Sequence, residues 1–278
     1  MAKRESIREL LRAHVPNDGF RMASVDPDST PGFKGGKQLA LSEVKDDEPV
    51  LFDLQDRLYA ESKQSLLVVL QGMDTSGKDG TITHVVGNFN PQGVYITAFK
   101  APTAEERKHH FLWRIRKHVP PAGGIGIFNR SHYEDVLIVR VHSLAPPKVI
   151  DKRYEEINAF EKELINGGTR IVKICLHISY EEQRQRLIDR LKNPDKHWKF
   201  NEHDIDERAL WDDYQSAYSI AITRCSTPDA PWCVVPADSK AYRNWAVSKI
   251  LLETLREMNP RFPQPKLATA RLLKRLKG

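Results

Sequence analysis

An apolar run that leads directly into a glycine-rich loop is the feature of this 278-residue chain that most limits its possible folds. Residues 66–82 read LLVVLQGMDTSGKDGTI, so Gly72 and the Gly77-Lys78 pair have the G-x-x-x-x-G-K spacing of a phosphate-binding loop. Glycine lets the backbone turn tightly and brings N–H groups close to an anion. The pattern predicts a buried strand, a phosphate-binding loop and a helix beginning at about Lys78, whose ammonium would reach the phosphoryl oxygens; a plain glycine-rich turn is the alternative.

Two carboxylates distinguish this loop from the usual one, in which a Ser or Thr after the lysine binds magnesium. Asp79 occupies that position, and Asp74 lies inside the loop. A carboxylate repels bound phosphates unless a cation lies between them, so Asp74 predicts a magnesium site; the alternative is that it caps the turn. Asp79 is one residue into the expected helix, where its charge suits the helix dipole with or without a metal.

Short apolar runs separated by amphipathic stretches continue along the chain. Strands are predicted at 66–70, 94–99, 125–128, 171–178 and 232–236, and helices at about 78–88, 103–118, 147–166, 180–192, 206–224 and 240–258. Near-continuous apolar strands alternating with helices predict a parallel sheet covered on both faces. Right-handed crossovers place the loops after the strands along one edge of that sheet, where ligands bind in open α/β folds. The phosphate-binding loop lies on this edge.

Composition narrows the class of protein. The chain is 40% hydrophobic and 29% charged, as is ordinary for a soluble globular protein, and it has no apolar run of membrane-spanning length and no secretory signal. Three scattered cysteines predict neither a disulfide framework nor a zinc site, so we expect a cytoplasmic protein with reduced thiols. The net charge of +6 favours an anionic partner, and no nucleic-acid-binding signature accompanies it.

The chain divides into three expected parts. Residues 1–65 form an N-terminal extension that packs on the core, residues 66–265 form the catalytic domain, and residues 266–278 form a basic tail. The tail carries five basic residues and no acid. It is interpreted as a solvated segment, with binding of an anionic polymer or of a neighbouring subunit as alternatives.

A second polar constellation follows the expected strand at 125–128, in the stretch GIGIFNRSHYEDVLIVRV. Asn129 stands at the strand end, where a typical phosphate-loop kinase has a magnesium-binding Asp. Carboxylates follow as Glu134 and Asp135, bracketed by Arg130 and Arg140, whose guanidinium groups suit a transferring phosphoryl group. A purely structural ion-pair network is the alternative.

A third stretch, QRQRLIDRLKNPDKHWKF, has the composition of a lid. It contains six basic residues against two acidic ones, with Arg186 and Arg190 one helical turn apart. Pro194 breaks the helix before Lys196 and Lys199. A helix ending in a basic turn predicts a lid at about 183–205 that closes over phosphates and excludes water, although a solvated helix face has the same composition.

These three stretches, together with APWCVVPADSKAYRNW at 230–245, resemble the family-2 polyphosphate kinases over about residues 32–265. The run NRSHYED is similar to the subgroup that phosphorylates both nucleoside mono- and diphosphates. The resemblance implies a three-layer α/β/α fold like that of thymidylate kinase, with a parallel five-stranded central sheet and a helical lid. It also implies reversible, Mg²⁺-dependent phosphoryl transfer, with Mn²⁺ able to substitute, and assembly as a homodimer or homotetramer.

The resemblance also assigns roles to residues. The catalytic set it implies is Asp74, Lys78, Arg130, Glu134, Asp135 and Arg140, with Asp74 and Asp135 binding the metal. The phosphate-binding set is Gly72, Met73, Thr75, Ser76, Gly77, Lys78, Asp79 and Gly80. The lid set is Arg186, Arg190, Lys196 and Lys199, and the nucleotide-binding set is Asn129, Arg130 and Glu134.

The expected function is therefore a phosphotransferase that passes phosphoryl groups between inorganic polyphosphate and AMP, ADP or ATP, with GMP and GDP as further acceptors. Neither nucleic acid nor membrane is an expected partner. Two alternatives remain: an ATP-dependent nucleoside monophosphate kinase, and a phosphate-loop protein that binds nucleotide or polyphosphate without turnover.

Overall fold

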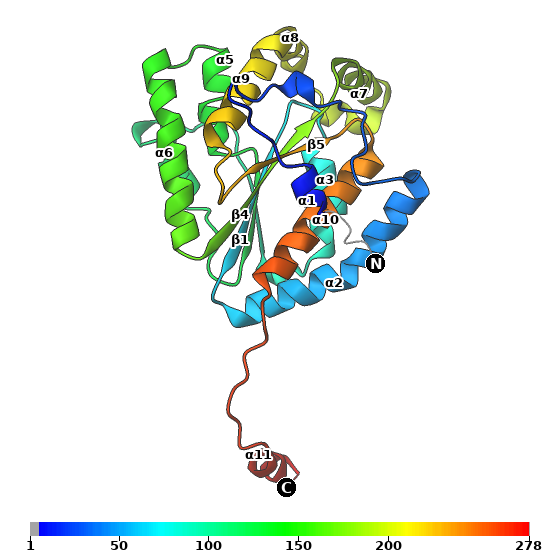
Figure 1. The fold of residues 1–278 in the computed structure, drawn as a ribbon, viewed down its shortest axis with the longest axis vertical. Helices are drawn as coiled ribbons and strands as arrows, with labels where there is room; N and C mark the ends of the chain where they lie inside the picture. The colour runs from blue at the N-terminus through cyan, green and yellow to red at the C-terminus, as the bar shows by residue number, and fades with distance from the viewer. Residues whose placement is uncertain (1–5, 278) are drawn as a thin grey trace.

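A five-stranded parallel sheet forms the centre of the computed structural model, which describes residues 6–277 (Figure 1). The strands are β1 Ser65–Gln71, β2 Val94–Ala98, β3 Ile125–Asn129, β4 Thr169–His177 and β5 Trp232–Pro236. Their order is β2-β3-β1-β4-β5, which places β1 in the middle and β2 at an edge. The predicted strands and the parallel sheet are confirmed.

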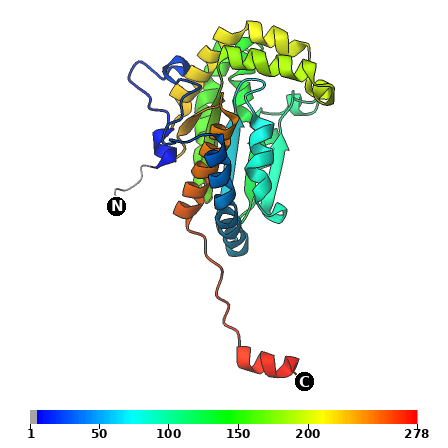
Figure 2. The same ribbon diagram turned by 90° about the vertical axis from the view of Figure 1, so that its right-hand side faces the viewer.

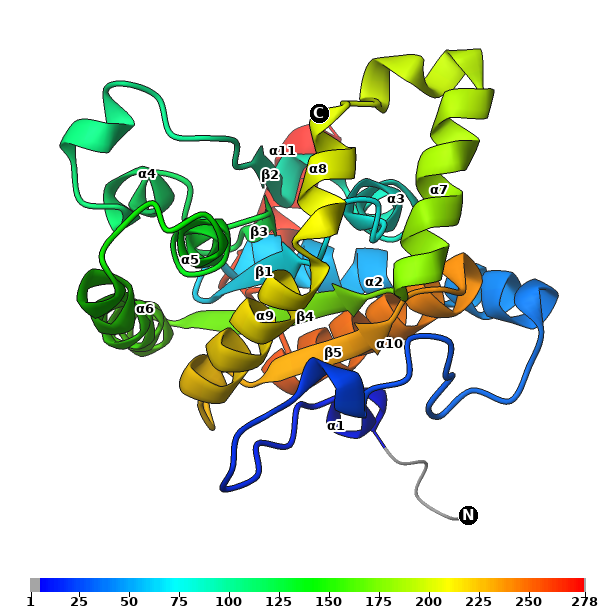
Figure 3. The same cartoon turned by 90° about the horizontal axis from the view of Figure 1, so that it is seen from above.

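The two faces of the sheet bury separate apolar clusters. Because successive side chains of a strand point to opposite faces, Leu66, Val68 and Leu70 of β1 lie in one cluster and Leu67 and Val69 in the other. The first cluster includes residues of α2 and α10, and the second includes residues of α4, α6 and α9. The predicted three-layer α/β/α architecture is therefore confirmed (Figure 3).

Helices connect the strands and flank them on both sides. They are α1 Ile7–Leu10, α2 Lys37–Glu61, α3 Lys78–His84, α4 Leu112–Arg116, α5 Ile138–Val141, α6 Pro147–Asn166, α7 Tyr180–Lys192, α8 His203–Ala209, α9 Trp211–Cys225, α10 Lys240–Met258 and α11 Thr269–Leu276. Among residues 6–277 no helix combines the length and apolarity that crossing a bilayer requires.

Three expected helices differ from the structure. The stretch 103–118 contains only a 3₁₀ turn at Glu106–Lys108 and α4, because residues 105–110 are all polar and offer no apolar face to bury. The expected helix at 78–88 ends at His84 and continues as a 3₁₀ turn. The expected helix at 206–224 is divided at Leu210 into α8 and α9.

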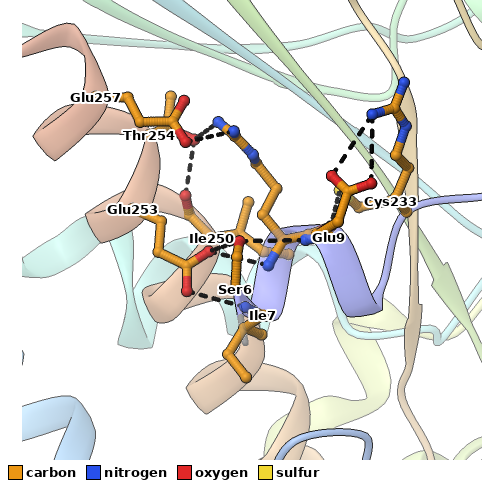
Figure 4. A network of polar contacts seen from close by, with 10 residues as sticks. Ser6, Ile7, Glu9, Cys233, Ile250, Glu253, Thr254 and Glu257 are labelled. Atoms are coloured by element: carbon orange, nitrogen blue, oxygen red, sulfur yellow. Dashed lines mark hydrogen bonds and ion pairs between the residues drawn. The ribbon is translucent and has the colours of Figure 1, made fainter. Parts of the chain in front are cut away.

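The N-terminal segment packs closely on the body. Glu253 of α10 accepts hydrogen bonds from the backbone N–H groups of Ile7 and Arg8 and from the Ser6 hydroxyl, which fixes the start of α1 (Figure 4). Further along, Arg12 forms an antiparallel bridge with Cys233, so the segment covers the outer edge of β5. The long helix α2 then packs along α10 (Figure 1).

The helices α7 and α8 lie at the upper end of the sheet in Figure 1. A 3₁₀ turn at Pro194–Lys199 connects them. Pro194 is the first residue of that turn, and Asn193 before it has extended backbone, with its side chain accepting a hydrogen bond from the N–H of Asp195. This segment stands beside the loop that follows β1, in the position expected for a lid.

Candidate active site

The loop that joins β1 to α3 is held in shape by two glycines and a buried arginine. Gly72 and Gly77 have φ angles of 150° and 104°, a region that favours glycine. A Cβ on Gly77 would lie 1.8 Å from Nη1 of Arg243, a residue of α10 that is only 3% exposed. Glycine at position 77 thus lets a buried guanidinium approach the loop backbone directly.

Three charged side chains meet at the loop. Lys78 donates hydrogen bonds to the carbonyls of Gly72 (2.7 Å) and Met73 (3.2 Å), and Arg130 donates one to Asp74 at 2.6 Å. Burial acts to raise the pKa of Asp74, but the nearby charges of Lys78 and Arg130 hold it below its ordinary value. Burial lowers the pKa of Lys78, opposed by Asp74. The cluster concentrates charge at the point where phosphate is expected.

Arg130 has an unusual backbone for a residue with a Cβ. Its φ is 61°, and its N–H donates to the carbonyl of Leu70 at the end of β1. Such left-handed conformations of non-glycine residues cost energy and cluster at functional sites. The strained turn directs the guanidinium of Arg130 toward Asp74.

Arg186 was expected to act on the lid, and the structure gives it a different set of partners. It donates hydrogen bonds to the carbonyls of Thr75, Ser76, Ala237 and Asp238, and it pairs with Glu182 at 2.7 Å. Only 6% exposed, it joins α7 to the phosphate-binding loop and to the turn after β5. Its guanidinium therefore holds the loop, the turn after β5 and α7 together.

The remaining lid residues line the cleft. Arg190 lies 3.5 Å from Asp204 of α8, and Lys199 lies 4.0 Å from Asp79. Asn129 donates a hydrogen bond to Asp79 at 2.8 Å, so the expected nucleotide-binding Asn and the loop carboxylate are in contact. Lys196 lines the same cleft. The structure thus brings the lid and the loop to one site.

The expected pairing of Asp74 with Asp135 is not found among the described residues. Asp135 receives a hydrogen bond on its carbonyl from Arg153 and pairs with the same guanidinium at 3.3 Å, and burial raises its pKa. Neighbouring side chains of a 3₁₀ turn point in different directions, and it is Glu134 that faces the charges of Lys78 and Arg130.

Arg140 also lies apart from the loop. It pairs with Asp151 at 2.9 Å and donates to the Tyr154 hydroxyl at 3.2 Å, both residues of α6. The cleft is lined by neither Arg140 nor Asp135. Position along the chain suggested that both would reach the site, but the turn after β3 carries them to the α6 side.

Buried hydroxyls beside the loop test whether a cation fits there. Oxygen atoms of Thr75, Ser76 and Thr81 are buried and have no hydrogen-bond partner among residues 6–277. Of these residues, Thr75 lines the cleft together with Asp74, and these two side chains offer the oxygen ligands that Mg²⁺ prefers. No group of three or more His, Cys, Asp and Glu side chains converges to hold a metal in the described part of the chain. The donor set fits a magnesium ion shared with substrate phosphates.

The cleft around the loop is large and basic. Its volume is about 1040 Å³, and eleven Lys or Arg residues line it against five Asp or Glu residues. Five of these cations were not singled out from the sequence: Lys37, Lys45, Lys100, Lys240 and Arg243. Burial lowers the pKa of Arg243 to about 10, and Arg186 adds to this effect. The last two lie in the stretch ADSKAYRNW, whose similarity to the family was the available signal.

A phosphate-binding loop after the central strand, a basic cleft and a helical lid define a P-loop kinase-like phosphotransferase. The sequence model of one family, described as Polyphosphate kinase 2 (PPK2), matches residues 37–263. The chain belongs to the polyphosphate kinase 2 family.

Individual relatives agree with this assignment. The chain is 50% identical over 258 residues to the AMP/ADP-polyphosphate phosphotransferase of Meiothermus ruber, covering 93% of this chain and 97% of that protein. It is 44% identical to the ADP-polyphosphate phosphotransferase of Rhodopseudomonas palustris, over 77% and 78% of the two chains. The crystal structure of Polyphosphate Kinase 2 from Arthrobacter aurescens superposes with a TM-score of 0.92 at 48% identity, over 98% of both chains.

Proposed function

We propose that the protein transfers phosphoryl groups between inorganic polyphosphate and AMP or ADP, as the names of its relatives describe for those proteins. The observation that carries the proposal is the charge of the cleft, where cations outnumber acids by eleven to five. A triphosphate would engage only part of this set, whereas a longer polyanion can contact cations from α2, α10 and the lid. GMP and GDP are further candidate acceptors.

The transfer itself needs positioning and charge compensation more than covalent chemistry. A phosphate oxygen of the acceptor attacks the terminal phosphorus of polyphosphate, a new P–O bond forms, and the bridging P–O bond breaks. The shortened polyphosphate keeps the electron pair of that bond. Lys78 and Arg130 lie where they would stabilise the negative charge on the transferring group.

Asp74 and Thr75 would hold Mg²⁺, or Mn²⁺ in its place, and the ion would neutralise phosphate charge between donor and acceptor. Asp135 would have to leave Arg153 to join them, and its role as a second ligand stays a prediction. Glu134 and Asn129 lie near Arg130 and Asp79, where they would contact the acceptor nucleotide. Arg190, Lys196 and Lys199 would close over the phosphates and exclude water.

The test supplies AMP or ADP with polyphosphate and Mg²⁺ and no ATP, and follows products by ³¹P nuclear magnetic resonance. We expect ADP and ATP to appear as the polyphosphate signal shortens. With AMP as the only nucleotide, an ATP-dependent monophosphate kinase would give no product. With ADP it would give equal amounts of ATP and AMP while the polyphosphate signal stays unchanged. Tight binding of polyphosphate with no product under either condition would identify a binding protein. We place the reaction in the cytoplasm, where nucleotides are available.

A further inference from the structure

The backbone of Thr75, in the loop that follows β1, adopts a strained conformation. Its φ is 64°, in the left-handed region that a residue with a Cβ seldom occupies. Such a conformation persists only where the surrounding structure holds it in place. The strain lies at a sensitive point, because the peptide group before Thr75 joins it to Asp74, and these two residues carry the proposed metal ligands.

Two side chains of α7 hold the backbone on either side of this strained residue. The Gln183 amide donates a hydrogen bond to the Asp74 carbonyl at 3.2 Å, and Arg186 donates one to the Thr75 carbonyl at 2.9 Å. Residues three apart share one face of a helix, so a single helix reaches both carbonyls. Gln183 is 2% exposed, and its amide therefore needs partners within the protein.

The amide of Gln183 is held in one orientation by α8. Arg208 donates a hydrogen bond to Oε1 of Gln183 at 3.2 Å. Because a guanidinium has only donors, it must meet the amide oxygen, which leaves Nε2 to face the Asp74 carbonyl. Arg208 is itself fixed by Tyr180, since it donates to the carbonyl of that residue and its guanidinium carbon lies 3.3 Å from the centre of the ring.

Helix α8 is in turn anchored beside Arg208. Glu207 is 8% exposed, accepts a hydrogen bond from the Tyr214 hydroxyl of α9, and lies 2.8 Å from Nε2 of His142. In Figure 2, α7 (yellow-green) and the segment that contains α8 (yellow) lie together at the upper end of the sheet. A continuous series of contacts therefore runs from α9 through α8 and Gln183 to the peptide beside Asp74.

We propose, on the basis of the function proposed above, that Gln183 is a positioning residue for the metal ligands Asp74 and Thr75, and that Arg208 acts through it. Asp74 and Thr75 line the cleft, whereas Gln183 does not. Its amide keeps the peptide between the two ligands in the orientation that serves the cleft. The lid helices thus contribute to metal binding as well as to the exclusion of water.

Hydrogen exchange at the loop tests this role without substrate or metal. Gln183→Leu keeps a side chain of similar size and removes the donor, so amides in a peptide spanning residues 72–78 should exchange at least tenfold faster than in the parent. Gln185→Leu is the matched control, because Gln185 is an exposed residue of the same helix that donates to Asp189, and it should leave the loop unchanged. Urea unfolding verifies that both variants are folded.

The dependence of the rate on Mg²⁺ gives a second readout. At saturating ADP and polyphosphate, Gln183→Leu should need about tenfold more Mg²⁺ for half-maximal rate, as for other groups that orient a metal ligand, while the KM for ADP stays within a few-fold. Gln183→Glu keeps the shape and the contact with Arg208 but sets a carboxylate oxygen against the Asp74 carbonyl, so its effect should be larger. A smaller effect of Gln183→Glu would show that only shape matters and would overturn the proposal.

Arg208→Met tests the contribution of α8. It keeps the Gln183 amide but frees its orientation, so it should raise the Mg²⁺ requirement by a smaller factor than Gln183→Leu does. In the Gln183→Leu background it should add nothing, and an independent contribution would contradict an action through Gln183. Because Arg208 is only half-buried, this variant also serves as the test if Gln183→Leu does not fold.

Asp74→Asn, measured alongside, separates the two possible failures. If Asp74→Asn is inactive while Gln183→Leu has the loop exchange and the Mg²⁺ dependence of the parent, the role of Gln183 is wrong and the proposed function stands. If Asp74→Asn keeps full activity, the proposed metal site is wrong, and the role of Gln183 is lost with it.

Discussion

Two charged clusters lie on opposite sides of the turn after β3, and they are built from similar side chains. The cleft cluster consists of Asp74, Lys78, Arg130 and Glu134. The buried cluster consists of His132, Tyr133, Glu161 and Lys173. Lys78, Glu161 and Lys173 are buried and Glu134 is half-buried. The cleft is lined by Asp74, Lys78 and Arg130 of the first cluster and by no member of the second.

The buried cluster satisfies its own charges. The Lys173 ammonium donates to Glu161 at 2.6 Å, to the Tyr133 hydroxyl at 3.0 Å and to the Cys225 carbonyl at 2.6 Å, which uses all three of its hydrogens. Tyr133 in turn donates to Glu161 at 2.7 Å. Lys173 is fully buried and Glu161 is 2% exposed. Apart from Nδ1 of His132, which has no hydrogen-bond partner among the described residues, the network pairs its polar side chains and fixes the turn that carries Arg130 and Glu134.

Two charged groups of the cleft cluster, those of Lys78 and Glu134, form no ion pair among the described residues. Lys78 donates to two carbonyls and to no carboxylate, and Glu134 receives a hydrogen bond only from the Gln71 amide among the described residues. The pKa values of Glu134 and Glu161 shift in opposite directions. Burial raises the pKa of Glu134, whereas Lys173 and His132 overcome burial and hold the pKa of Glu161 below its ordinary value. Satisfied charge stabilises the fold, and unsatisfied charge is available to a substrate.

The largest expected effect breaks the cleft cluster alone. Asp74→Asn removes a carboxylate that is one-third exposed, so the free energy of unfolding should change little. The rate of phosphoryl transfer should fall about 10³-fold, because charge compensation at the phosphates is lost. Initial rates with polyphosphate and ADP, and urea unfolding of the same sample, measure both. Near-full activity would remove Asp74 from the proposed site.

The converse change breaks the buried cluster. Glu161→Gln leaves the Lys173 ammonium buried without a carboxylate, which should lower the free energy of unfolding by about 3 to 5 kcal/mol. The KM for nucleotide in the fraction that remains folded should stay within a few-fold of the parent. The double variant Lys173→Met/Glu161→Leu is the control, since it removes both charges and should lose less stability than the single variant. Equal losses would show that packing, and not charge, dominates.

Much of this arrangement could be predicted from the sequence because the relevant signals are local. Buried parallel strands are continuous apolar runs, and the glycine spacing of the loop lies within eight residues of β1. The positions of the loop, the lid and the sheet edge follow from topology. The same reasoning predicted where the cleft lies, but it did not predict which charged side chains pair within it.

The pairings depended on contacts between distant segments. Glu134 and Asp135 are adjacent in sequence, and only the 3₁₀ turn decides which one faces the loop and which one faces Arg153. Arg186 carries the periodicity of a lid residue, yet carbonyls from segments 50 and 110 residues away surround it. The buried cluster gave no sequence signal, because a lysine within β4 is interpretable only when its partners from α6 are known.

Arg186 sharpens the comparison because it belongs to neither cluster and yet orders the loop. Arg186→Lys retains the charge but cannot reach four carbonyls with a single ammonium. We expect kcat to fall about 10- to 100-fold, as for other residues that orient a binding group. Arg184→Lys, an exposed residue of the same helix, is the matched control and should have no effect on kcat. Kinetics at saturating nucleotide separate kcat from KM, and unaltered kcat would contradict a positioning role.

The smallest expected effect is a gain in stability. Glu134→Gln keeps an oxygen for the Gln71 amide and removes a charge whose pKa burial raises. For a carboxyl with a raised pKa, the ionised form opposes folding at neutral pH, and this cost disappears as the pH falls toward the ordinary value of 4.5. The variant should therefore be more stable than the parent by about 1 kcal/mol at pH 7 and equal to it near pH 4.

For Glu161→Gln the sign is opposite, because the lowered pKa of Glu161 stabilises the fold above 4.5 and that contribution is lost on acidification. Urea unfolding of both variants from pH 4 to pH 7 should give differences of opposite sign: the Glu134→Gln difference should shrink as the pH falls to 4.5, while the Glu161→Gln difference should persist down to 4.5 and shrink only below that value. Differences of the same sign would mean that the two glutamates play the same role.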